Sequence, residues 1–186
     1  MGRPKALILA EAGESWSARA ARILHEGGCD DVVVVLGADA GQARALLPAN
    51  DWLRSVTAGD YTSGLSRSLV RGLATITEHP AEAVVLTLAD LPTAVPGEVL
   101  RVLGLEPGSA LPTAGATTLR RAVHAGVPGH PVVIGRDHWA SVATEARGDL
   151  GAGPFLRSRG VELVECGDLS DGRDADSPGP PQTGLL

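Results

Sequence analysis

The chain has 186 residues, enough for one domain with a proper core and too few for two domains of ordinary size. Hydrophobic residues make up 44% of it but aromatic residues only 3%, so alanine, valine and leucine must build the core. The net charge of −6 argues against nonspecific nucleic-acid binding, which needs a basic surface. An acidic protein can still bind phosphate groups through a divalent metal or through backbone N–H groups.

Neither cysteine usage nor hydropathy points to export or to a membrane. Cys29 and Cys166 lie far apart and form no ligand cluster, as is usual for thiols in a reducing compartment. The apolar run over residues 6–10 is shorter than the roughly 7–15 residues of a signal-peptide core. It is also far shorter than the about 20 residues of a membrane span. We therefore expect a cytoplasmic protein with no membrane segment.

Helices and strands alternate along the first half of the chain. Ser15 is placed to cap a helix whose apolar face carries Trp16, Ala20 and Ile23, and glycines at 27 and 28 would end that helix. The β-branched run over residues 32–36 predicts a buried parallel strand. Further on, the pattern predicts a short helix capped by Asp39 and reaching Leu47, a helix over 65–76, a strand over 83–88 and a helix from Pro96 through Leu103.

The second half is less regular but continues the alternation. Strands are expected over 132–134 and 161–164, with helices over 138–146 and 151–159 between them. The predicted fold is an α/β domain, with a mainly parallel sheet flanked by helices. Residues 1–176 would form this single domain, and the proline-rich residues 177–186 would form a loose tail.

One carboxylate stands where α/β sheets bind their ligands, at the carboxyl end of a strand. Asp90 follows the predicted strand 83–88 almost directly, and Pro92 stiffens the turn. A carboxylate there is placed to hold Mg²⁺ against the phosphates of a nucleotide, because Mg²⁺ takes only one or two protein carboxylates. Capping of a helix or turn explains the same residue equally well.

The other polar candidates are weak when taken singly. Asp174 and Asp176 supply a carboxylate pair after the last strand, but aspartate-rich turns are usually solvated. Ser66 and Ser68 stand at a helix start, where anions are favoured and where simple capping by Ser66 is an equal alternative. The remaining candidates are Lys5 near the terminus, His130 just before a strand, and Asp149, which is placed to cap a helix beginning near residue 151.

Several enzyme classes are excluded by motifs that the sequence lacks. It has no Walker loop, no HExxH, no CxxC and no nucleophile elbow. These absences argue against ATPases, zinc hydrolases and serine hydrolases.

Taken in order, the polar segments resemble the MobA-like NTP transferase family, especially its molybdenum cofactor cytidylyltransferase branch. Residues 1–7, MGRPKAL, match the closing half of the family's opening signature LAAGxGxRMGxPKxL. Residues 50–52 and 64–69 resemble its NxxW and GmxxSL segments, and 88–92 resemble its metal-binding DxP turn. Residues 126–132, 148–152 and 174–178 resemble GxPGHPV, GDxGAR and DxDTP.

The resemblance departs from the family pattern at the N-terminus. If Met1 corresponds to the methionine of the signature, the first strand and the glycine-rich loop of the family have no counterpart in these 186 residues. Aligning Arg19 with the signature arginine instead leaves too little room before the strand at residue 32. We therefore expect a shortened N-terminus, in which residues 6–10 could take the place of the first strand and displace Lys5. Smaller departures are His124, where the family often has tyrosine, and Gly153, where it has arginine.

The resemblance implies a Rossmann-like nucleotidyltransferase that joins CMP or GMP, from CTP or GTP, to molybdopterin and releases pyrophosphate. It implies that Asp90, with Asp176 or Asp174, holds Mg²⁺ and that Lys5 neutralises the triphosphate. Ser66 and Ser68 would help define the nucleotide site, and His130 and Asp149 would line the acceptor side. Two alternatives stay open: a nucleotidyltransferase for a sugar phosphate or another phosphorylated metabolite, and a non-catalytic nucleotide- or cofactor-binding protein that has lost the glycine-rich loop.

Overall fold

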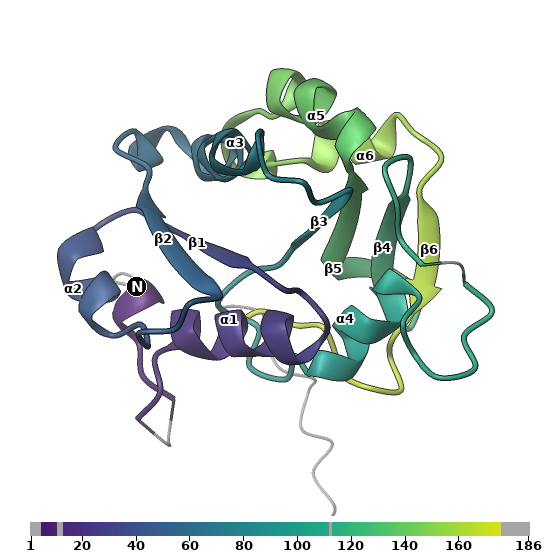
Figure 1. Ribbon diagram of the computed structural model, residues 1–186, viewed down its shortest axis with the longest axis horizontal. Helices are drawn as coiled ribbons and strands as arrows, with labels where there is room; N and C mark the ends of the chain where they lie inside the picture. The colour runs from purple at the N-terminus through teal and green to yellow at the C-terminus, as the bar shows by residue number, and fades with distance from the viewer. Residues whose placement is uncertain (1–4, 11–12, 112, 176–186) are drawn as a thin grey trace, which may run out of the picture.

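The strands form two sheets in the computed structural model, which describes residues 5–10, 13–111 and 113–175 (Figure 1). In the first sheet, β1 (Val32–Leu36) and β2 (Leu53–Thr57) pair in parallel. The second sheet has the order β3-β5-β4-β6, with β3 (Ala83–Leu86), β4 (Leu119–His124), β5 (Val127–Gly135) and β6 (Glu162–Glu165). β5 runs antiparallel to β3 and β4, and β6 runs parallel to β4. Three of these four strands therefore share one direction.

Helices cover both faces of the sheets. In Figure 1, α1 (Trp16–Glu26) and α4 (Pro96–Leu103) lie together below the strands, and they contact each other. Above the strands lie α3 (Leu65–Ile76), α5 (Trp139–Glu145) and α6 (Gly153–Arg157), while α2 (Ala40–Ala45) lies beside β1. This arrangement confirms the predicted α/β fold, with strands flanked by helices. Within the described residues, no helix is long and apolar enough to cross a bilayer.

The two faces of β5 build two separate halves of the core, because successive side chains of a strand point to opposite faces. Ile134 packs with Leu73, Trp139 and Phe155 beneath the upper helices. Val133 packs with Val102, Ala122, Val164 and Cys166 on the other face. The second half is built from small side chains, as the low aromatic content predicts, whereas the first half is filled partly by the aromatic rings of Trp139 and Phe155.

Local capping signals locate some helix ends correctly and others wrongly. Ser15 caps α1 as predicted, its hydroxyl accepting from the Ala18 N–H at 3.1 Å, and α3 and α4 have the expected bounds. Asp39 precedes α2 in a left-handed conformation and its side chain makes no capping bond. The fully buried residues of α1 are Ser17, Ala18, Ala21 and Ile23, whereas Trp16 and Ala20 of the predicted apolar face are only half-buried.

Residues 6–10 do not replace a strand in either sheet. Lys5–Leu7 form a short 3-10 helix, and Leu9 makes an isolated bridge to Ser15 beside the start of α1. Leu9 is 51% exposed, which no central strand residue would be. The prediction that this run fills the position of the first strand is therefore wrong.

Candidate active site

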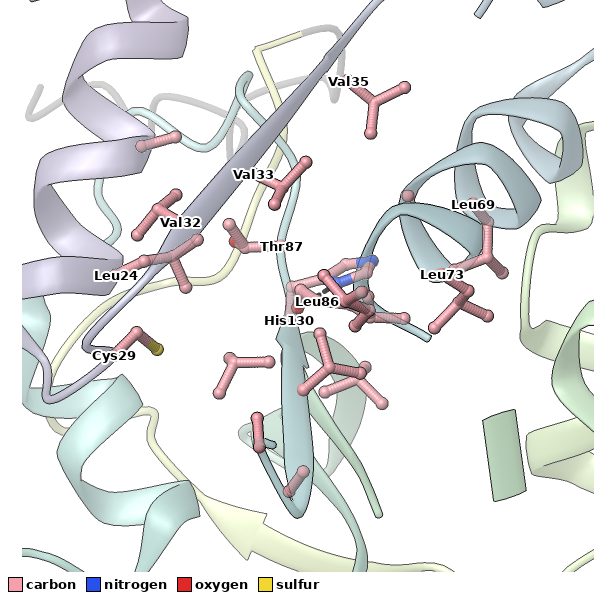
Figure 2. Close-up of a pocket in the computed structure, with 18 of the residues that line it drawn as sticks. Leu24, Cys29, Val32, Val33, Val35, Leu69, Leu73, Leu86, Thr87 and His130 are labelled. Carbon is pink, nitrogen blue, oxygen red and sulfur yellow. Dashed lines mark hydrogen bonds between the residues drawn. The ribbon is translucent and has the colours of Figure 1, made fainter. Parts of the chain in front are cut away.

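A cavity of about 960 Å³ separates the two sheets (Figure 2). Val32 to Val35 of β1 line one side, and residues 83–89, which include β3, line the other. Among the described residues, β1 pairs only with β2 and β3 pairs only with β5. Each strand thus turns an edge without a strand partner toward the cavity, and the sheet is interrupted between them.

The sequences of the two strands are typical of the middle of a parallel sheet, where both faces are buried. β1 is a run of valines and β3 reads AVVL, yet most of their side chains are only half-buried. Leu24 from α1 and Leu69 and Leu73 from α3 complete the apolar walls, as Figure 2 shows. The cavity therefore has the lining that an additional apolar strand would need on both edges and both faces.

Asp90 lies at the carboxyl end of β3, just beyond the cavity lining, and is only 7% exposed. Its carboxylate forms an ion pair with the Lys5 ammonium, which residues 5–7 bring to this edge. Its backbone carbonyl accepts the Ala175 N–H at 2.9 Å. The structure thus brings together the two ends of the described chain and the turn after β3, with Lys5 in contact with Asp90.

Arg19 holds the Asp90 turn in place from α1. Its guanidinium donates to the carbonyl oxygens of Leu91 at 3.0 Å and Ala94 at 2.8 Å. Two bonds from one planar group fix both the position and the orientation of the turn. From the sequence alone, Arg19 has the pattern of a solvated helix charge, so its contact with the turn was not predicted.

The C-terminal segment brings a second carboxylate to the same edge. Asp171 accepts a hydrogen bond from the Thr93 hydroxyl at 2.5 Å, and Ala175 bonds the backbone of Asp90. Asp174 lies between these two attachment points, whereas Asp176 lies outside the described residues. Within the described ranges no cluster of three or more His, Cys, Asp or Glu side chains could hold a metal. An Mg²⁺ site here would therefore be of the open kind, with few protein carboxylates and with ligand oxygens completing the shell.

The two serines at the start of α3 lie on different sides of the helix. Ser68 lines the large cavity, whereas Ser66 lines a smaller one of about 320 Å³ together with Arg67 and Arg147. Residues two apart on a helix do not share a face, so both cannot contact one ligand. Ser66 does not cap the helix either, since the N-cap position is Gly64.

Asp149 caps a helix, but not the one predicted. It lies in the 3-10 turn Gly148–Leu150, and its Oδ1 accepts the Leu65 N–H of α3 at 3.3 Å. Gly64 has a φ of 101°, and a Cβ there would collide with the backbone of Gly148. Glycine is required at this close approach, which holds the turn at the N-terminus of α3. The expected cap of a helix near residue 151 is thus wrong.

A family model described as the MobA-like NTP transferase domain matches residues 1–164. The chain belongs to this family. Nicotine blue oxidoreductase from Paenarthrobacter nicotinovorans is 33% identical to it over 185 residues, covering 95% of this chain and 86% of that protein. The predicted family resemblance is confirmed.

Solved structures agree with this membership of the MobA-like family. Rv0371c from Mycobacterium tuberculosis H37Rv superposes with a TM-score of 0.70 at 25% identity, over 89% of this chain and 80% of that one. A nucleotidyl transferase from Methanothermobacter thermautotroptrophicus shares the fold, with a TM-score of 0.67 at 21% identity, over 87% of this chain and 74% of that one. The family and the fold together support a nucleotidyltransferase-like activity for this MobA-like chain.

His130 of this MobA-like chain lies in the wall of the large cavity, next to β3 (Figure 2). Its Nδ1 is 3.3 Å from the Leu86 carbonyl oxygen. Burial lowers the pKa of His130 from its ordinary value, against the opposing effect of the hydrogen bond to Leu86. The imidazole is therefore neutral at physiological pH, and a neutral ring can donate one hydrogen bond and accept another.

The lowered pKa of His130 predicts an acid-dependent loss of stability. The unfolded chain binds the proton more readily than the folded one, so this group's contribution to the free energy of unfolding is fully present above about pH 6.5. It is lost progressively as the pH falls below that value toward the folded pKa. When the pH is lowered from 7.5 to below about 6.5, we expect the free energy of unfolding to fall less in the His130→Asn variant than in the wild type. Urea denaturation at each pH measures this difference. Parallel pH profiles for the two proteins would contradict the assignment.

Proposed function

We propose that the chain transfers CMP or GMP, from CTP or GTP, to the phosphate of molybdopterin and releases pyrophosphate. The observation that carries this proposal is the pairing of Asp90 and Lys5 at the carboxyl end of β3, in a MobA-like chain. A phosphate oxygen of the acceptor forms a bond to the α-phosphorus, and the bond from that phosphorus to the oxygen bridging it to the β-phosphorus breaks. Such a reaction depends on positioning and on charge neutralisation more than on a protein nucleophile.

The carboxylates at this edge of the sheet would bind the metal. Asp90, with Asp174 or Asp176, would hold Mg²⁺, which when bound neutralises charge on the phosphates. Lys5 contributes a second positive charge beside Asp90, and Arg19 keeps the turn rigid. Rv0371c has been solved in complex with manganese, which makes Mn²⁺ a suitable spectroscopic probe for this chain.

The remaining proposed site residues divide between the two ligands. Ser68 borders the large cavity and is the better placed of the two serines to define the nucleotide side, while Ser66 faces the smaller cavity. His130 and Asp149 are assigned to the acceptor side. There the neutral His130 ring, whose Nδ1–H faces the Leu86 carbonyl oxygen, would accept a hydrogen bond at Nε2 without adding charge, and Asp149 would fix the loop after α5 against α3.

Measurement of pyrophosphate release with a panel of acceptors tests this function. With Mg²⁺ and either CTP or GTP, we expect release with molybdopterin and little with sugar phosphates. Release with a sugar phosphate but not with molybdopterin would favour the alternative acceptor class. Nucleotide binding without any release would favour the non-catalytic alternative.

One comparison favours a second function. The relative with 33% identity is an oxidoreductase by name, acting on nicotine blue. If the present chain shares that activity, it should change the absorbance of nicotine blue in the presence of a two-electron donor or acceptor. An unchanged absorbance would leave the nucleotidyltransferase as the function that the Asp90 edge supports.

A further inference from the structure

A buried polar network lies behind the Asp90 turn, on residues to which the proposed reaction assigns no role. Glu98, on α4, is only 2% exposed, and His124, at the end of β4, is also buried. Glu98 Oε1 is 2.7 Å from His124 Nε2 and accepts the Ser170 hydroxyl at 2.8 Å. Glu98 Oε2 accepts the Val95 N–H at 3.0 Å. One carboxylate thus joins the helix after the Asp90 turn, a central strand and the C-terminal segment.

The imidazole of His124 is enclosed by backbone. A Cβ added at Gly172 would overlap the ring, and one added at Gly129 would approach its Nδ1 to 2.9 Å. Gly172 also has a φ of 64°, which glycine adopts at little cost, and its N–H donates to the Ser170 hydroxyl at 3.1 Å. The segment around residue 170 can therefore lie against His124 only because position 172 has no side chain.

The contacts of this segment lead directly to the proposed metal ligands. Ser170 binds Glu98, Asp171 binds Thr93, and Ala175 binds the backbone of Asp90. Asp174 is carried between the second and third of these attachments. A buried carboxylate is costly unless it is fully hydrogen-bonded, so loss of a single partner of Glu98 should release the segment.

We propose that His124, Glu98 and Ser170 are positioning residues, which anchor residues 170–175 so that Asp174 stands beside Asp90. This inference rests on the proposed function, because the proposed reaction requires Asp174 to help Asp90 hold the metal. The network touches no substrate. Its effect on the reaction passes through the position of Asp174 and its neighbours, and it should therefore alter metal affinity rather than only the stability of the fold.

The test compares network variants with a stability-matched control. His124→Phe keeps an aromatic ring but removes the contact to Glu98, and Ser170→Ala is a milder change should the first variant fold poorly. Val142→Ala is the control, because Val142 lies on α5 and is fully buried in the other half of the core. Mn²⁺ alone is the probe, titrated by its paramagnetic effect on water relaxation, and thermal unfolding gives the loss of stability of each variant.

We expect His124→Phe to weaken Mn²⁺ binding at least tenfold and Ser170→Ala to weaken it severalfold, while Val142→Ala leaves it within twofold. Hydrogen exchange at Gly172 and Ala175 should accelerate in the network variants only. Unchanged affinity and unchanged exchange in His124→Phe would overturn the proposal, as would equal losses in Val142→Ala. If the wild type and Asp90→Asn bind Mn²⁺ equally, the proposed metal site fails. The exchange data then decide the anchoring separately.

Discussion

A chain extended at its N-terminus by an apolar strand and the glycine-rich loop LAAGxGxR is expected to bind CTP or GTP about a thousandfold more tightly than residues 1–186. Backbone N–H groups of such a loop donate to phosphate oxygens, and each hydrogen bond to a charged group contributes roughly 1.5–3 kcal/mol. Two such bonds amount to about 4 kcal/mol, which is close to a thousandfold in affinity. Calorimetry of both lengths, under the same Mg²⁺ and nucleotide conditions, measures the difference.

The cavity between β1 and β3 gives this prediction its structural basis. An added strand would meet an edge on each side and apolar walls from α1 and α3, so the extension should also raise the unfolding temperature. A matched extension with two prolines in the strand is the control, because proline cannot join the middle of a sheet. Equal nucleotide affinity for residues 1–186 and the extended chain would show that residues 6–13 already bind phosphate and that the alignment of Lys5 is wrong.

The Asp90→Asn variant is expected to lose Mg²⁺-dependent nucleotide binding, with a loss of stability of at most about 1–2 kcal/mol. The substitution removes the charge that a metal requires but keeps the shape of the side chain, and the cost for stability is of the size seen for a lost cap. Its ion pair with Lys5 adds little, because the lysine side chain is 43% exposed.

The Glu145→Gln variant is a suitable control for this measurement. Glu145 ends α5 and pairs with Arg159 at the surface, and it lines neither cavity. We expect it to bind Mg²⁺–nucleotide like the wild type. Undiminished Mg²⁺-dependent affinity in Asp90→Asn, or an equal loss in Glu145→Gln, would remove Asp90 from the metal site.

Local sequence signals predict those elements whose stability is local. The structure has the predicted cap at Ser15, a strand at the valine run of β1, a helix at the helical spacing of α3 and a helix start at Pro96 of α4. Each depends on a few neighbouring residues. The position of Asp90 at the end of a strand follows from the same kind of signal.

The missed strands owe their stability to distant partners. β4 reads LRRAVH, which lacks the alternation or apolar run of a typical strand, yet Arg120 is only 2% exposed. It is held there by Glu162 of β6 at 2.6 Å and by the Val102 carbonyl oxygen. β2, reading LRSVT, was missed for a similar reason, since its backbone pairs with β1, where Leu53 lies opposite Val32. No window of sequence contains these pairings.

The candidate site likewise combines residues that the sequence pattern indicates with residues that only distant contacts bring into place. Lys5 and Asp90 are brought together as the family pattern implies, but Arg19, Glu98 and His124 acquire their roles only through tertiary contacts. Asp149 was correctly expected to cap a helix, although the helix proved to begin at Leu65, 84 positions earlier in the chain. A cap of that kind cannot be inferred from neighbouring residues.

Nucleotidyl transfer is tested most directly by following the α-phosphate. CTP or GTP labelled at the α-phosphate is incubated with molybdopterin and Mg²⁺, using residues 1–186 and the N-terminally extended chain, and the acceptor is separated from the nucleotide. We predict that the label moves to molybdopterin, slowly with residues 1–186 and rapidly with the extended chain, while label placed at the γ-phosphate leaves in pyrophosphate. Appearance of the γ-label on the acceptor, or no transfer of the α-label by either protein, would contradict the proposed function.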